Sequence, residues 1–301
     1  MVEGSSSIAR VRAMCKKKEI RVLDLTAREY AFMARGYFDS GLFDKALECV
    51  ENACYLYPEV EGYLLDEEYA RCLQIRAYIL GQTGEKKQFV KAFRKAKKIR
   101  KKQNDAVGYA DCLIDEGTAF CDLGKFNKAV RLRKKALKRL SVLPDAVDKR
   151  NKALYFLGAS YYKKRKDGKA ERCFIDAVKG GEGDERLFFA LSCTEVRLKK
   201  YEDALKYLFI AQKKCEDENI DTPYDEHLGE IYLLIGDVYT LMELPIKAVK
   251  FYARALKVCE GNDRVKKDPA YKNTLLKLYS TYDKLGESDH AQAMLRLWEQ
   301  A

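Results

Sequence analysis

Apolar residues recur every three to four positions along almost the whole chain, which is the period of an amphipathic α-helix. Runs that alternate Val, Ile or Thr with polar residues, the pattern of strands, are nearly absent. Three of the five prolines, Pro144, Pro223 and Pro269, lie in the segments between the periodic stretches. The pattern therefore predicts an all-α chain.

The segment GTAFCDLGKFNKAVRLRKKAL, residues 117–137, shows how the predicted helices are separated. As one helix it would carry Gly124 in its middle, which costs about 1 kcal/mol relative to alanine. Two antiparallel helices joined by a turn fit better, because glycine can take the left-handed backbone conformation that ends a helix. Gly117 and Ala129 are then the small residues at which the two helices approach each other closely.

The same arrangement recurs along the chain. Each copy has a repeat anchor near the start of its second helix, and successive repeat anchors are 43, 40, 41, 34, 44 and 43 residues apart. They are Ala46, Phe89, Ala129, Ala170, Ala204, Ala248 and Ala291. Twelve positions earlier a small residue lies in the first helix: Ala34, Ala77, Gly117, Gly158, Ser192 and Gly236. This constant offset indicates an internal repeat.

The order large-x-x-large-small-x-x-aromatic in the first helix, followed by alanine, aromatic and alanine in the second, resembles the signature of the tetratricopeptide repeat family. One copy reads Leu154, Leu157, Gly158, Tyr161, Ala170, Phe174 and Ala177. The resemblance covers Tyr30 to Trp298 and implies a right-handed superhelical solenoid of about seven helical hairpins. Intervals above the family's usual 34 resemble the extended-helix subclass of Pins/LGN-type adaptors, kinesin light chains and bacterial Rap regulators.

We expect residues 1–25 to be an N-terminal segment, partly flexible or a capping helix, and residues 26–301 to be a single solenoid. Thr26 and Glu29 have the spacing of a capping box at the start of the first helix. Approximate repeats are expected at 26–58, 66–103, 107–143, 148–180, 184–215, 224–260 and 269–301. The chain ends at LRLWEQA soon after the last predicted helix, which we interpret as a fragment or a protein with further domains.

Stacked hairpins of this family present a groove that is lined by the first helix of each pair and holds a peptide. The family's groove-facing positions lie six and three before, and one and four after, the small residue. We predict that the peptide-binding groove is formed by Arg28, Arg35, Phe38, Arg71, Gln74, Tyr78, Lys152, Tyr155, Tyr162 and Phe189. The third copy would present Asp111, Ile114, Thr118 and Cys121.

This predicted groove is basic and aromatic in the first five copies, and arginine and tyrosine often dominate binding at interfaces. We therefore expect a protein partner that contributes a peptide with an acidic stretch and a few apolar side chains. The alternative for aromatic residues such as Tyr162 and Phe189 is packing against adjacent helices. Ala31 and Arg35 replace the lysine and asparagine of the two-carboxylate clamp in chaperone-binding members, so a chaperone tail is not expected.

The net charge is +11, and the excess is concentrated in two runs. Residues 86–102 hold ten Lys or Arg and residues 131–139 hold six, both on predicted second helices, which face the convex side. We define the basic stripe as Lys91, Arg94, Lys95, Lys98, Arg131 and Lys134. This stripe is either a solvated helix face or a surface for RNA, an anionic membrane or an acidic protein. RNA binding, through the stripe or the groove, is the alternative function.

The residues that catalysis or metal binding requires are sparse. The chain has two histidines, His227 and His290, and its ten cysteines include no CxxC pair. We therefore expect a non-catalytic protein with no cofactor and no metal, and cysteines that are reduced. The Gly-rich segment 180–183 lacks the preceding strand and the following GK[ST] of a phosphate loop, and is predicted to be a turn.

The chain has no run of eighteen apolar residues, and its start lacks the continuous apolar segment of a secretory signal. We expect a cytoplasmic location without membrane insertion. The nucleus is the alternative, because the four basic residues 163–166 resemble a short nuclear-localisation motif.

Overall fold

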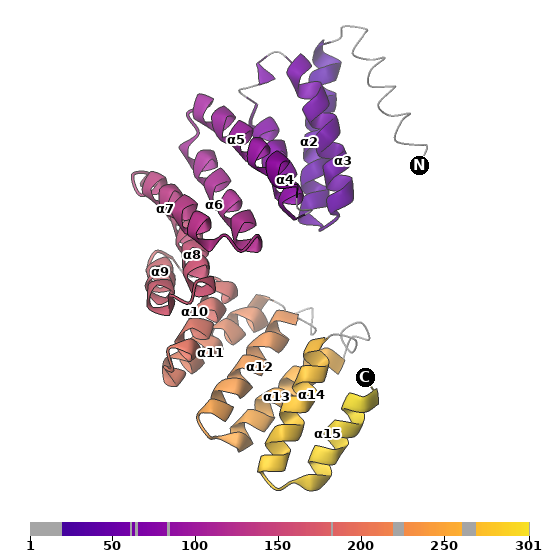
Figure 1. Cartoon of the computed structure of the whole chain (residues 1–301), viewed down its shortest axis with the longest axis vertical. Helices are drawn as coiled ribbons and strands as arrows, with labels where there is room; N and C mark the ends of the chain where they lie inside the picture. The colour runs from indigo at the N-terminus through magenta and orange to yellow at the C-terminus, as the bar shows by residue number, and fades with distance from the viewer. Residues whose placement is uncertain are drawn as a thin grey trace. The chain divides into compact units, whose positions relative to one another are not determined.

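The computed structural model describes residues 20–60, 62–63, 66–82, 85–181, 183–218, 226–260 and 269–300. Within these ranges all regular structure is helical, with fourteen α-helices and one short 3₁₀ helix (Figure 1). The all-α prediction is confirmed. It holds because the apolar positions repeat with the helical period and because Gly and Pro separate the periodic stretches.

The helices follow one another as seven pairs along the chain, which confirms the predicted series of helical hairpins. The pairs are α2 (Ile20–Asp39) and α3 (Phe43–Leu56), α4 (Glu67–Gln82) and α5 (Lys86–Lys102), α6 (Ala106–Asp122) and α7 (Phe126–Leu140), α8 (Val147–Lys163) and α9 (Asp167–Lys179), α10 (Glu185–Arg197) and α11 (Tyr201–Glu218), α12 (Glu226–Leu241) and α13 (Pro245–Glu260), and α14 (Pro269–Lys284) and α15 (Ser288–Gln300). The 3₁₀ helix η1 (Tyr57–Glu59) follows α3.

The chain divides into two compact units, residues 1–164 (unit 1) and residues 165–301 (unit 2). In unit 1, α2, α4 and α6 each pack on the second helix of their own pair and on the first helix of the next pair, so that α2, α4, α6 and α8 form one row (Figure 1). In unit 2, α12 packs between α11 and α13, and α14 packs on α13 and α15. Nearest-neighbour packing of this kind defines a helical repeat array. That residues 26–301 form one continuous right-handed solenoid stays a prediction.

The repeat anchors occupy the core of each pair. Six of them have no exposed surface and Ala291 is 3% exposed. The six small residues twelve positions earlier are also buried. In the seventh pair the same offset leads to Tyr279, which is half-buried. The spacing of small residues thus marks the positions at which the two helices of a pair cross.

In six of the seven pairs a left-handed backbone residue lies two positions after the end of the first helix, at Gly41, Gly124, Arg165, Lys199, Glu243 and Gly286; after α4 this position lies outside the described residues. After α6, Gly124 has φ +68° and the next residue, Lys125, donates its N–H to the Phe120 carbonyl at 2.7 Å. This confirms the turn predicted at Gly124. Three of the six positions carry side chains, although this conformation costs a residue with a Cβ about 1–2 kcal/mol.

The predicted start of the first helix is wrong. Helix α2 begins at Ile20, so Thr26 lies inside it and does not cap it. A Thr-x-x-Glu pattern caps a helix only where the preceding backbone is not helical, and here residues 20–25 continue the helix. Residues 1–19 and Pro223 lie outside the described residues, whereas Pro269, also expected between periodic stretches, is the first residue of α14.

The side chains of eight of the ten cysteines are described, and all eight are free thiols. Burial raises the pKa of Cys54 and of Cys193 to about 11, and it raises the pKa of Cys72 and of Cys112 further. Such thiols are protonated at neutral pH and behave as small apolar side chains. No helix among the described residues has both the length and the apolar character that a membrane span needs.

Candidate peptide-binding cavity

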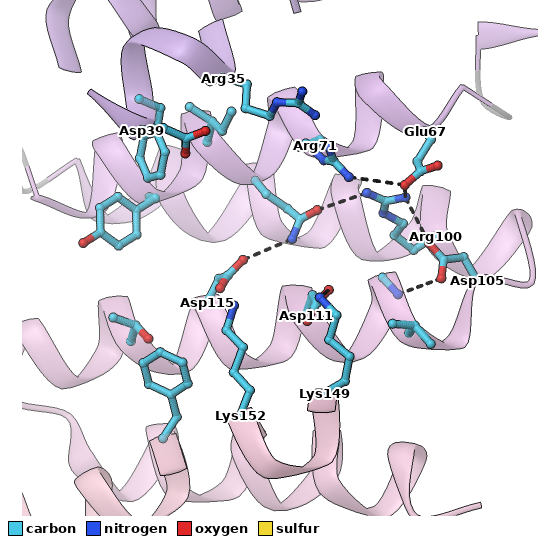
Figure 2. Close-up of a pocket in the computed structure, with 18 residues that line it drawn as sticks. Arg35, Asp39, Glu67, Arg71, Arg100, Asp105, Asp111, Asp115, Lys149 and Lys152 are labelled. Atoms are coloured by element: carbon cyan, nitrogen blue, oxygen red, sulfur yellow. Dashed lines mark hydrogen bonds and ion pairs between the residues drawn. The ribbon is translucent and has the colours of Figure 1, made fainter. Parts of the chain in front are cut away.

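A cavity of about 780 Å³ lies in unit 1 along the row of first helices (Figure 2). We call it the charged cavity. It is lined by Arg35, Phe38 and Asp39 of α2, Glu67, Arg71, Gln74, Ile75 and Tyr78 of α4, Arg100 of α5, Asp105 before α6, Val107, Gly108, Asp111, Asp115 and Thr118 of α6, and Lys149, Lys152 and Phe156 of α8.

Six of the ten predicted groove residues line this cavity together: Arg35, Phe38, Arg71, Gln74, Tyr78 and Lys152. Asp111 and Thr118 of the third copy also line it. They converge because α2, α4, α6 and α8 lie side by side, so equivalent positions of successive pairs face the same space. That these residues bind a peptide stays a prediction.

The other four predicted groove residues lie elsewhere. Arg28 is exposed and pairs with Asp66 at 3.1 Å, and Tyr155 and Tyr162 are half-buried on α8. Phe189 belongs to unit 2, where it packs against the core with its ring 5.2 Å from that of His227. Phe189 therefore packs against adjacent helices, which was the alternative considered for the aromatic residues.

Two groove positions of the sequence prediction face the core instead. Ala31 and Ile114, each three residues before the small residue, have at most 1% of their surface exposed. Both belong to clusters of buried apolar side chains. A position three residues from a buried one lies less than one helical turn away, so an apolar residue there joins the core stripe.

The cavity is not basic, which corrects the expectation for this part of the groove. Its five cations, Arg35, Arg71, Arg100, Lys149 and Lys152, are matched by five carboxylates. These are Asp39, Glu67, Asp105, Asp111 and Asp115. Only Asp111 occupies a position that the sequence assigned to the groove. The other four were missed because the family's pattern assigns only four positions of each first helix to the groove, and these carboxylates lie at other positions.

Ion pairs connect several of these charges. Arg71 lies 3.4 Å from Glu67, Arg100 lies 3.0 Å from Asp105, and Lys149 lies 3.0 Å from Asp111. Arg100 is 3% exposed although it belongs to the basic run of α5. The signal that could have revealed it is its spacing of four and seven residues from Ala96 and Phe93, which are both buried.

Gln74 of α4 forms hydrogen bonds with a residue of α5 and a residue of α6. Its Nε2 donates to Asp115 at 3.2 Å, and its Oε1 accepts a hydrogen bond from Arg100 Nη2 at 3.4 Å (Figure 2). Burial raises the pKa of Asp115 to about 6, and the nearby Asp111 charge adds to the rise. Lys152, Lys149 and the hydrogen bond from Gln74 act in the opposite direction.

The basic runs divide into outward and inward members. The six residues of the basic stripe are exposed, although Lys95 donates to the Tyr69 hydroxyl at 2.5 Å. In the same runs Lys97 pairs with the buried Glu116 at 2.6 Å, and Arg100 and Arg133 point inward. A helix turns every side chain by about 100°, so a dense basic run cannot keep all its members on one face.

Arg133, 2% exposed, ties α6, α7 and α8 together behind the cavity wall. Its Nη1 donates to the Phe156 carbonyl at 2.6 Å and to Ser160 Oγ at 2.5 Å, and its Nη2 donates to Thr118 Oγ1 at 2.8 Å. Burial lowers the pKa of this guanidinium. Phe156 and Thr118 line the cavity, so Arg133 holds two of its residues in place.

The lining of the charged cavity combines several kinds of side chain. Its lining contains charged, amide, aromatic and aliphatic side chains, with Thr118 as the single hydroxyl besides Tyr78, and no Cys, His or Ser. Among the described residues no group of three or more His, Cys, Asp or Glu is arranged to hold a metal ion. The lining can therefore pair charges and make apolar contacts with a bound segment.

Two segments of the chain match the family model of the tetratricopeptide repeat, residues 70–103 and 229–262. The first covers most of α4 and all of α5, including Gln74, Tyr78 and Arg100 of the charged cavity. The chain therefore resembles the tetratricopeptide repeat family in its second and sixth helical pairs. Its expected likeness to Pins/LGN-type adaptors stays a prediction.

Comparison with solved structures shows which proteins the chain resembles in fold. The chain resembles the apo form of RapI with a TM-score of 0.65 and 17% identity, over 91% of this chain and 75% of that one. A Rap protein complexed with Competence and Sporulation Factor has a TM-score of 0.59 and 17% identity, over 92% and 74%. BtubC (BKLC) from P. vanneervenii has a TM-score of 0.63 and 18% identity, over 75% and 90%. Comparison with curated proteins finds no match.

Proposed function

We propose that this protein is a non-catalytic scaffold that binds a peptide segment of a partner protein in the charged cavity. The observation that carries the proposal is the convergence of charged and aromatic side chains from four first helices on one cavity. Its volume lies in the range of about 300–1,000 Å³ that is usual for ligand pockets. A Rap protein of the same fold supports the proposal, since it has been solved in complex with Competence and Sporulation Factor.

The cations at the cavity rims suit acidic side chains of the partner. Lys152 is exposed, and among the described residues no ion pair joins it to a carboxylate. Arg35 and Arg71 pair with Glu68 at 3.9 Å and 3.5 Å. Exposed pairs of this kind contribute about 0–1 kcal/mol, so a ligand carboxylate can replace them at little cost.

Apolar side chains of the partner find aromatic surface beside these cations. Phe38 and Tyr78 contact each other edge to face, with ring centroids 5.3 Å apart. Phe156 lies on α8 with the Lys152 ammonium 6.0 Å from its ring centroid. Aromatic surface next to a cation accommodates an apolar residue that adjoins an acidic one.

The test is an affinity pull-down from host-cell extract with the wild type and two charge-reversal variants, with and without RNase. Lys152→Glu alters the cavity, and Lys91→Glu makes the same charge change on an exposed residue of α5. We expect a protein that is lost with Lys152→Glu, retained with Lys91→Glu and indifferent to RNase. Reversing Arg35, Arg71 and Lys152 together should abolish binding completely. Retention by this triple variant, with an unchanged melting temperature, would place the partner elsewhere.

RNA binding is the second candidate, supported by the exposure of all six residues of the basic stripe. Phosphate contacts by these cations would make the affinity fall steeply with salt. The measurement is the anisotropy of a labelled single-stranded RNA at several salt concentrations. A steep salt dependence that weakens with Lys91→Glu would support RNA binding, and no binding at low salt would remove it.

A further inference from the structure

Carboxylates lie in the middle of the charged cavity, with cations on both sides. Asp111 and Asp115 are one turn apart on α6, so both project from the same face of that helix. Figure 2 shows them between α4, which carries Arg71, and α8, which carries Lys149 and Lys152. We call Asp111 and Asp115 the floor of the cavity. The rims are thus basic and the floor is acidic.

The floor carboxylates are incompletely paired by the chain itself. Asp111 Oδ2 accepts from Lys149 Nζ at 3.0 Å, whereas Asp111 Oδ1 is buried and has no hydrogen-bond partner. Asp115 accepts from the neutral amide of Gln74 at 3.2 Å. A neutral donor satisfies one lone pair but does not compensate a buried negative charge. The burial that raises the pKa of Asp115 to about 6 is consistent with this deficit.

Two of the neighbouring cations, Arg71 and Arg100, are paired with carboxylates outside the floor. Arg71 pairs with Glu67 and Glu68, and Arg100 pairs with Asp105. Lys149 forms an ion pair with Asp111. Lys152 attracts Asp115 without forming an ion pair with it. Among the described residues, no cation forms an ion pair with both floor residues, and none forms one with Asp115.

We propose that the floor binds a cationic side chain, lysine or arginine, of the partner segment. This inference rests on the proposed function and adds the charge pattern of the ligand. A guanidinium or ammonium group on the floor places a positive charge beside both Asp111 and Asp115. The partner segment then carries a basic residue on the floor and acidic residues towards Lys152 and Arg71. A purely acidic segment would leave the floor unpaired and add like charge to it.

The test is a peptide array of 15-residue sequences in four classes, with the same apolar residues and acidic, basic, mixed or neutral charged positions. The array is probed with the full chain in the presence of EDTA, which removes divalent cations as competing ligands. We expect mixed-charge peptides to be retained most strongly. Replacing the Lys or Arg of the best peptide by norleucine should weaken its affinity about tenfold or more in fluorescence anisotropy.

Two variants assign the effect to the floor. Asp115→Asn keeps the size of the side chain and removes its charge, whereas Asp122→Asn makes the same change at an exposed position of α6. We expect Asp115→Asn to lose about tenfold in affinity for peptides with a basic residue and to bind the norleucine peptide as the wild type does. Asp122→Asn should match the wild type with both peptides. Thermal melts of both variants verify that they are folded.

The outcomes separate the two proposals. Strongest retention of acidic peptides without a basic residue, at equal affinity in wild type and Asp115→Asn, would overturn the cationic floor and leave peptide binding in the cavity standing. Basic peptides that bind the wild type and are lost with Asp115→Asn support the floor. Failure of all four classes to bind would overturn both the floor and the proposed function.

Discussion

The ring of Tyr252 lies so close to Gly236 that a Cβ on that glycine would be 2.4 Å from the ring atom Cε1. Gly117 stands in the same relationship to Arg133, sixteen residues later in its own pair, with 2.9 Å to Arg133 Nε. In both hairpins the glycine of the first helix makes room for a bulky side chain of the second. The absence of a side chain at these positions is therefore a packing requirement.

Substitution at Gly236 should destabilise unit 2. Gly236→Ala should cost about 1–3 kcal/mol and Gly236→Leu more, because the backbone or Tyr252 must move. The control is Gly229→Ala on the same helix, where the new Cβ would lie 3.6 Å from Val258. That change should stabilise by about 0.5–1 kcal/mol, since alanine is the better helix former.

The measurement is urea denaturation followed by circular dichroism. Gly117→Leu, at the equivalent position of α6, is expected to behave as Gly236→Leu does, because Arg133 fills the corresponding space. An unchanged midpoint for Gly236→Leu would mean that the assigned repeat register is wrong in that pair.

Glu195 should make the stability of unit 2 depend on pH. Its side chain is 2% exposed, its Oε2 has no hydrogen-bond partner, and burial beside Glu171 raises its pKa to about 7. Because the folded-state pKa is raised, the folded protein binds a proton that the unfolded chain releases near pH 4.5. The contribution of Glu195 to stability is therefore full below that pH and is lost as the pH rises through 7.

Glu195→Gln is expected to be more stable than the wild type at pH 8, by on the order of 2 kcal/mol, and equal to it at pH 4.5. Thermal melts at the two pH values measure the difference. Glu202→Gln, an exposed position of α11, is the matched control and should show no pH-dependent gain. A gain for Glu195→Gln of the same size at both pH values would show that ionisation is not its cause.

Neighbouring lysines of α5 should differ sharply in their effect on stability. Lys97 pairs with Glu116 at 2.6 Å, and this glutamate is buried, whereas Lys98 is exposed. Lys97→Met leaves a buried carboxylate without its partner and should cost about 3 kcal/mol. Lys98→Met should change the stability by less than about 0.5 kcal/mol. Equal urea midpoints for the two variants would contradict the inward position of Lys97.

Glu243 occupies the left-handed turn position after α12, with φ +59°, where Gly286 stands after α14. Glu243→Gly should raise the stability of unit 2 by about 0.5–1 kcal/mol, the relieved strain exceeding the entropy that glycine loses on folding. Glu243→Ala removes the same carboxylate but keeps the Cβ, so it should give no gain. A thermal melt in which both variants shift alike would attribute the effect to the charge.

The hairpins could be read from the sequence because their determinants are local. A close helix crossing needs a small residue, so Ala34, Gly117 and Gly236 recur at one distance from their repeat anchors. A tight turn needs left-handed backbone, so Gly124 marks the end of a helix. The start of α2 was missed, since a capping pattern carries no information on whether the backbone before it is already helical.

Part of the charged cavity could be predicted, because a helical position within a hairpin determines which face a side chain occupies. The groove register places Arg71, Gln74 and Lys152 on first helices, and the side-by-side packing of these helices brings them together. The burial of Ala31 and Ile114 departs from that register, because small and aliphatic residues next to a core stripe are drawn into it.

The sequence by itself determined the helical pairs, their turns and the small residues at their crossings, because each depends on residues within one hairpin. Only the tertiary structure decided the charge of the cavity. Gln74 meets Asp115, and Lys149 meets Asp111, across 41 and 38 residues from different hairpins. Helical periodicity assigns a side chain to a face of its own helix. Which charges of neighbouring hairpins then meet depends on how those helices pack.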